Sequence, residues 1–106
     1  MPKYLIEATY TAQGLQGVAK DKASGRKAAV EKLVAGVGGK VESIYYALGE
    51  TDVIVIFDCP DTVSAAAVSL AVSSSGLVRT RTISLLSVEE VDQALSKSIS
   101  YRAPGA

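Results

Sequence analysis

Residues 41–57 read Val41-Glu-Ser-Ile-Tyr-Tyr-Ala-Leu48, Gly49-Glu-Thr-Asp52, Val53-Ile-Val-Ile-Phe57, a pattern typical of a β-hairpin. The second arm is an unbroken apolar run in which four of five residues are β-branched, and such a run indicates a strand that is buried on both faces. The four residues between the arms suit a short loop. The sequence therefore predicts two adjacent antiparallel strands, at residues 41–48 and 53–57.

The two faces of this hairpin differ in character. If Leu48 lies opposite Val53, side chains alternate between the faces with a period of two. One face then carries Ile44, Tyr46, Leu48, Val53, Val55 and Phe57, and the other carries Ser43, Tyr45, Ala47, Ile54, Ile56 and Asp58. We expect the first face to pack against helices. The second is too apolar for water, so we expect another cover for it.

Alternation and helical periodicity predict the other elements. Strands are expected at residues 3–10 and 77–86, a long connection at 11–23, and helices at 24–37, 62–75 and 87–97. Asp61 is placed to cap the second helix, and Ser87 with Glu90 forms a capping box for the third. Residues 1–98 are predicted to form one domain, followed by a tail at 99–106.

The predicted order is strand, helix, strand, strand, helix, strand, helix. It is the α+β, ferredoxin-like βαββαβ arrangement with an extra C-terminal helix. Right-handed crossovers place both main helices on one face of a four-stranded antiparallel sheet and leave the other face bare. Two bare faces can close into a dimeric α+β barrel. We expect a homodimer or higher homo-oligomer, with interface residues Ile54, Ile56, Ala47 and, in the tail, Tyr101.

Composition excludes several functional classes. The 106 residues hold 11 basic and 11 acidic side chains, so no net charge favours nucleic acid or an anionic membrane. The apolar runs are shorter than the roughly 20 residues of a membrane span. The single cysteine agrees with a cytoplasmic location, and the absence of histidine removes histidine-based metal sites and histidine general bases. We expect no metal, no cofactor, no nucleic acid and no membrane partner.

Several polar residues are candidates for a site. Glu7, Asp58, Arg79 and Arg81 can converge on the bare face if strand register permits, where Glu7, Tyr45 and Arg81 are weak candidates for acid–base chemistry. The simpler interpretation is a set of ion pairs across strands. The sequence does not fix the face that carries Arg79 and Arg81.

A ligand-binding loop is a second hypothesis. Its residues are Gly49, Asp52, Tyr45 and Asp58, although Gly49 and Asp52 also suit a simple turn. The basic residues Lys20, Lys22, Arg26 and Lys27 can hold a phosphate or carboxylate near a helix N-terminus, but such runs are usually solvated. Acidic neighbours disfavour a reactive thiolate at Cys59.

Five stretches of the sequence resemble the GYD-domain family of bacterial and archaeal proteins, to which no activity is assigned. They are Pro2-Lys-Tyr-Leu-Ile-Glu-Ala-Thr-Tyr-Thr11, Ser24-Gly-Arg-Lys-Ala-Ala-Val-Glu-Lys-Leu33, Gly49-Glu-Thr-Asp52, Val63-Ser-Ala-Ala-Ala-Val-Ser-Leu70 and Ser100-Tyr-Arg-Ala-Pro-Gly105. Thr51 stands where the family has an aromatic residue. The resemblance implies a dimeric α+β-barrel fold. The turn before a Val-rich strand also resembles the effector domain of leucine-responsive regulators.

These observations support three functional hypotheses. The residues favour a non-enzymatic, homo-oligomeric α+β-barrel module that binds a small ligand or acts as a scaffold. The alternative is a cofactor-independent oxygenase or isomerase that uses a cavity between paired sheets. A regulatory small-molecule sensor is the third.

Overall fold

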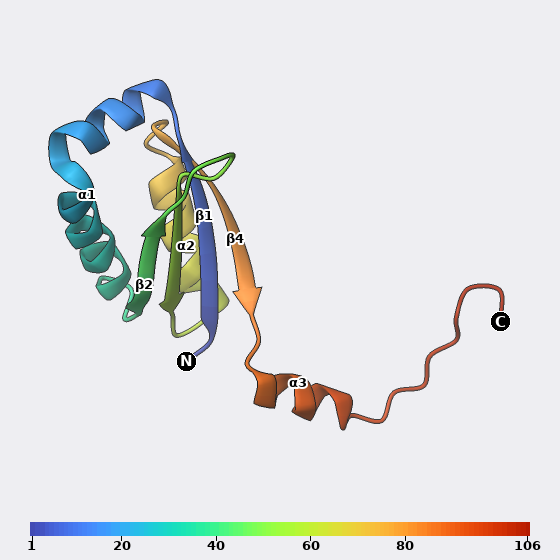
Figure 1. The fold of residues 1–106 in the computed structure, drawn as a ribbon. Coiled ribbons are helices and arrows are strands. Elements are labelled where there is room, and N and C mark those ends of the chain that lie inside the picture. The colour runs from blue at the N-terminus through green and yellow to red at the C-terminus, as the bar shows by residue number, and fades with distance from the viewer.

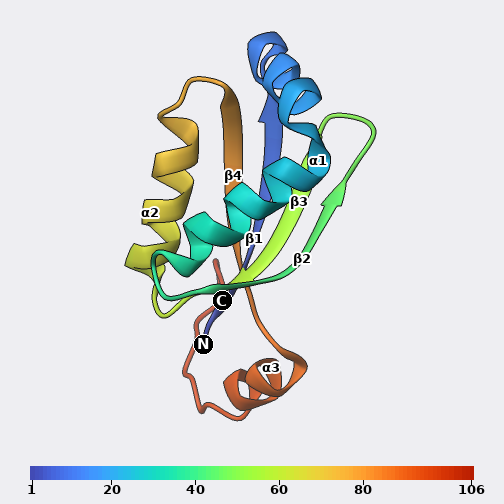
Figure 2. The same cartoon turned by 90° about the vertical axis from the view of Figure 1, so that its left-hand side faces the viewer.

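A four-stranded antiparallel sheet carries two helices on one of its faces (Figures 1 and 2). The computed structural model describes residues 1–106. The elements are β1 (Lys3–Tyr10), α1 (Ala12–Ala35), β2 (Lys40–Tyr46), β3 (Val53–Asp58), α2 (Thr62–Ser73), β4 (Val78–Leu85) and α3 (Val88–Leu95). The strand order is β2-β3-β1-β4. The predicted ferredoxin-like βαββαβ arrangement with an extra helix is confirmed.

The core lies between the sheet and the helices. Alternate residues of β1 and β3 point into it, as the period of two predicts, and α1, α2 and the turn after β3 close it. The buried apolar residues are Tyr4, Ile6, Ala8, Val34, Val53, Val55, Phe57, Cys59, Ala65 and Val68. The rings of Tyr4 and Phe57 pack with centroids 5.8 Å apart.

The hairpin has a different register from the predicted one. Tyr46, not Leu48, lies opposite Val53, and Leu48 is fully exposed in the loop that follows β2. The backbone N–H of Ala47 donates to the carbonyl of Asp52 at 2.8 Å, which closes the ladder before Leu48. Because the shift is two residues, Tyr46 still faces the helices.

Helix α1 begins much earlier than residue 24. The side chain of Thr11 accepts a hydrogen bond from the backbone N–H of Gly14 at 3.1 Å and caps the helix. The helix is interrupted at Lys22, whose φ of 65° and ψ of 164° are not helical. After Lys22 it continues to Ala35, so Ser24 lies inside the helix. The predicted connection at 11–23 was therefore wrong: two glycines weaken its helix propensity, but the Thr11 cap and the hydrogen bonds of Thr11 to the carbonyl of Leu77 stabilise the start of the helix.

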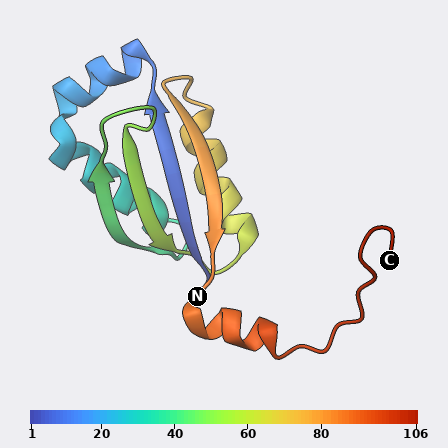
Figure 3. The ribbon, with the colours of Figure 1, turned by 45° about the vertical axis from the view of Figure 1, so that its right-hand side comes forward.

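The C-terminal arm, residues 86–106, extends away from the sheet (Figures 1 and 3). The Cα radius of gyration is 16.9 Å, whereas a compact chain of this length has about 13 Å. The Ser87–Glu90 capping box is present and starts α3 as predicted. Large apolar side chains of the arm are exposed: Leu86, Val88, Val91, Leu95, Ile99 and Tyr101. None of the helices combines the length and the apolar character needed to cross a bilayer.

Two glycines in the first half of α1 have opposite surroundings. A Cβ on Gly14 would lie 2.2 Å from the carbonyl oxygen of Leu77, whereas a Cβ on Gly17 would meet nothing within 4 Å. The same Leu77 oxygen accepts from the backbone N–H of Thr11 at 3.0 Å. Close approach of α1 to the start of β4 thus requires a residue without a side chain.

We expect Gly14→Ala to lower the free energy of unfolding by about 1–3 kcal/mol, because the clash outweighs the gain in helix propensity. Gly17→Ala, the matched control, should raise it by about 0.5–1 kcal/mol. Urea unfolding measures both. Equal effects of the two substitutions would show that α1 does not approach Leu77 closely.

Candidate functional site

The open face of the sheet, opposite the helices, brings several of the predicted residues into one row. Tyr45 lies opposite Ile54, Ile54 opposite Glu7, and Glu7 opposite Arg81. Arg79 lies opposite Thr9 on the same face. The register thus settles that Arg79 and Arg81 lie on the open face. This is the face of the sheet that is turned toward the viewer in Figure 3.

The next row along the open face is apolar. Ser43 pairs with Ile56, Ile56 with Leu5, and Leu5 with Ile83. None of these side chains is covered by a helix, and Ile83 is exposed. The centre of the open face is therefore an apolar band between two polar ends.

One polar end of the open face is a groove of about 440 Å³ beside the loop between β2 and β3. Glu7 and Arg81 both line it and form no ion pair with each other within 4.0 Å. Tyr45 does not line the groove, because Ile54 stands between it and Glu7. The lining residues are Glu7, Thr9, Glu50, Thr51, Arg79, Thr80 and Arg81. Guanidinium and carboxylate groups side by side can bind a polar ligand or transfer a proton.

Asp58 lies at the opposite end of the open face, away from this groove. Its Oδ1 accepts a hydrogen bond from Lys3 Nζ at 3.0 Å, and Glu42 Oε1 accepts from the same nitrogen at 2.8 Å. These hydrogen bonds, Glu42 first, raise the pKa of Lys3. Asp58 is thus engaged in an ion-pair cluster and is not brought together with Glu7 and Arg81.

Gly49 and Asp52 both have roles within the fold. Gly49 has a φ of 131°, a conformation that L residues rarely adopt. Asp52 Oδ2 accepts a hydrogen bond from the backbone N–H of Tyr10 at 2.8 Å, and the backbone N–H of Asp52 donates to Ala8 at 2.9 Å. The loop is thereby fastened to β1 at the rim of the groove.

Cys59 is fully buried behind the end of β3. Burial, with the nearby Asp61 carboxylate, raises the pKa of the Cys59 thiol. A thiolate nucleophile is therefore not favoured at this position. No cluster of three or more acidic or cysteine side chains is arranged to hold a metal ion.

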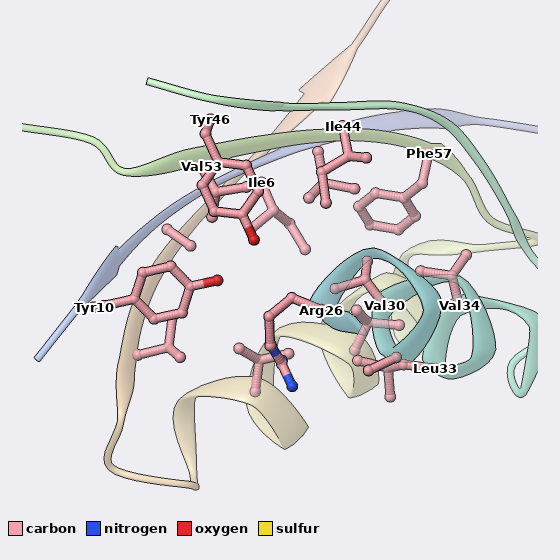
Figure 4. Close-up of a pocket in the computed structure, with 16 residues that line it drawn as sticks. Ile6, Tyr10, Arg26, Val30, Leu33, Val34, Ile44, Tyr46, Val53 and Phe57 are labelled. Atoms are coloured by element: carbon pink, nitrogen blue, oxygen red, sulfur yellow. The ribbon is translucent and has the colours of Figure 1, made fainter. Parts of the chain in front are cut away.

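A second hollow, which sequence reasoning missed, lies on the helix side of the sheet (Figure 4). It is an apolar cavity of about 70 Å³ under α1, next to a groove of about 310 Å³ between the first half of α1 and α2. Three side chains with polar ends line the cavity: Tyr10 from β1, Tyr46 from β2 and Arg26 from α1. The hydroxyl groups of the tyrosines point inward in Figure 4.

Tyr46 in this cavity stays protonated at neutral pH. Burial of its hydroxyl, together with hydrogen bonding by Tyr10, raises the pKa of Tyr46 to about 12. The residue is still 42% exposed. A sequence signal for Arg26 existed: it precedes Val30, Leu33 and Val34 on the stripe of α1 that faces the sheet.

A comparison with family models matches residues 4–95 to the GYD domain. A search of curated proteins finds no match. The matched region runs from the start of β1 to the last residue of α3 and so includes the sheet, both hollows and the loop between β2 and β3. The chain belongs to the GYD-domain family.

Proposed function

We propose that this protein is a homodimeric α+β-barrel module in which two sheets pack face to face and enclose a small-ligand chamber. The observation that carries the proposal is the apolar band at the centre of the open face, Leu5, Ile56 and Ile83, with Ile54 beside it in the next row. Apolar surface that no element of the chain covers favours association, since each buried Å² contributes roughly 25 cal/mol. A second copy is the partner that carries the same band.

Pairing of this kind changes the polar groove as well. The groove that contains Glu7, Arg79 and Arg81 adjoins the apolar band on the same face. A second sheet laid over the band also roofs the groove and turns it into a chamber between the two copies. Its charged walls fit a small polar ligand, while the apolar band supplies the assembly.

The C-terminal arm gives a second reason for self-association. Apolar side chains on α3 and the tail, among them Val91, Leu95 and Tyr101, contact no core of their own chain. The arm starts at Leu86, directly after β4, and therefore at the border of the open face. It is well placed to lie on a second copy and to enlarge the interface.

Replacing Ile54 and Ile56 together by aspartate should dissociate the dimer, because two charges would be buried without partners. We expect the dissociation constant to rise at least about thirtyfold, as for interface residues whose loss costs about 2 kcal/mol. Light scattering at low micromolar concentration measures the mass. Leu48→Asp, at an exposed loop position, is the control and should stay dimeric.

Circular dichroism must show that the double variant is folded. If it is not, Ile83→Asp on the edge strand β4 tests the same band at an exposed position. A folded variant of either kind that keeps the dimer mass contradicts pairing through this face.

Removal of residues 99–106 should weaken assembly, because Ile99 and Tyr101 then no longer contact the second copy. We expect a higher dissociation constant and a lower melting temperature at the same protein concentration. Analytical ultracentrifugation and calorimetry measure these quantities. An unchanged mass distribution and melting temperature would show that the tail takes no part in assembly.

A cofactor-independent oxygenase or isomerase is the second candidate. The observation that favours it is the position of Glu7 beside Arg81 in the groove, where a carboxylate base and a guanidinium can face one substrate. Mass spectrometry of small molecules that copurify with the protein distinguishes the two functions. Turnover of such a compound that Glu7→Gln abolishes indicates an enzyme, whereas a compound recovered unchanged after incubation indicates a binding module.

A further inference from the structure

The break in α1 leaves part of the helix side of the sheet uncovered. Before Lys22 the helix runs away from the sheet, and after it the helix returns and packs on β2 (Figures 1 and 2). The first half places Gly14, Gly17 and Val18 along one wall of the resulting groove, opposite α2 and β4. Gly17 adds no side chain to this wall, whereas Gly14 allows α1 to approach Leu77 closely at the end of the groove.

The groove and the apolar cavity adjoin each other. They share the residues Tyr10, Arg26, Leu33, Val72 and Val78. Of the residues that line the inner cavity, Arg26 is the only one that is not hydrophobic. The inner end of this space is suited to an apolar group, and its outer end is open to solvent.

Three side chains that can donate hydrogen bonds line the inner cavity, and two of them, Arg26 and Tyr10, also line the outer groove. Arg26 comes from α1, and Tyr10 and Tyr46 come from the sheet; in Figure 4 the tyrosine hydroxyls point into the cavity, and the flexible Arg26 side chain lies beside them with its guanidinium end turned away. The only ion pair of Arg26 joins its Nη1 to Asp21 Oδ2 at 3.8 Å, which is longer than a hydrogen bond. Most of the guanidinium donors are therefore free to bind a ligand.

The nature of these donors selects the ligand. A guanidinium matches the two oxygens of a carboxylate in a planar, bidentate arrangement, and a protonated phenol adds a further donor. One arginine, partly balanced by Asp21, provides too little positive charge for a phosphate dianion. The combination thus fits a single negative charge attached to an apolar body.

We propose that the space between α1, α2 and the sheet binds a small carboxylic acid, with its apolar part in the inner cavity and its carboxylate on Arg26, Tyr10 and Tyr46. The site lies on the opposite face of the sheet from the open-face groove. The proposed carboxylate site therefore does not depend on the proposed pairing of two sheets or on the ligand chamber between the copies.

Phenylacetate and its neutral amide, phenylacetamide, are suitable probes for the full-length protein. Titration of each at millimolar concentration, followed by amide chemical shifts, should move the signals of Tyr10, Arg26 and Tyr46 and leave those of Leu5 and Ile54 in place. We expect phenylacetate to bind about tenfold or more tightly than the amide, as for a hydrogen bond to a charged group.

Variants then separate this site from the open-face groove. Arg26→Gln should remove the preference for the acid, and Tyr46→Phe should weaken acid binding about fivefold through loss of one donor. Arg79→Gln, in the open-face groove, is the control and should bind both probes as the unaltered protein does. Spectra of each variant show whether it is folded.

Three outcomes would overturn the proposal. These are no shift with phenylacetate, shifts centred on Glu7 and Arg81, and an acid preference that survives Arg26→Gln in a folded variant. The dimer mass measured on the same samples reports on the sheet pairing separately, so failure of either proposal is recognisable by itself.

Discussion

The central position of β1 is the constraint on which the rest of the structure depends. β1 pairs with β3 along one edge and with β4 along the other, so its backbone groups are satisfied on both sides. Each side chain of a central strand must then point to one of two faces. Tyr4, Ile6 and Ala8 point to the helices, and Leu5 and Glu7 point to the open face. Helical cover exists for only one of these faces, because both crossovers have the same hand.

The open face combines an uncovered apolar band with charged groups at both of its ends. An apolar band crosses its centre, ion pairs around Lys3 lie at one end, and unpaired Glu7 and Arg81 lie at the other. A purely structural set of ion pairs would bring Glu7 and Arg81 into contact, as it does for Lys3 with Glu42 and Asp58. The free charges beside an apolar band are therefore the reason to connect assembly with ligand binding in one proposal.

The helix side of the sheet differs from the open face because helices cover it incompletely. Two-layer packing normally fills the space between a helix and a sheet completely. Here α1 is broken at Lys22 and a residual space remains, and Arg26 is the only residue lining its inner cavity that is not hydrophobic. A positive φ at a lysine is uncommon and costs conformational energy, so the surrounding structure must hold it. The uncovered space that accompanies this break is what we interpret as a carboxylate site.

The sequence by itself determined the elements whose signals are local. The apolar run at 53–57, the cap at Asp61 and the capping box at Ser87 depend on residues within a few positions of one another, and all three are observed where they were predicted. Family membership was also indicated by short local stretches, among them Gly49-Glu-Thr-Asp52, and the family match confirms it. The tertiary structure alone decided the hairpin register, the early start of α1, the position of Glu7 opposite Arg81, and the cavity that Arg26, Tyr10 and Tyr46 line together. These features depend on contacts between residues far apart in the chain, such as Asp52 with Tyr10 and Thr11 with Leu77. Neither periodicity nor helix propensity contains information about such contacts, because both describe a residue only through its neighbours in sequence.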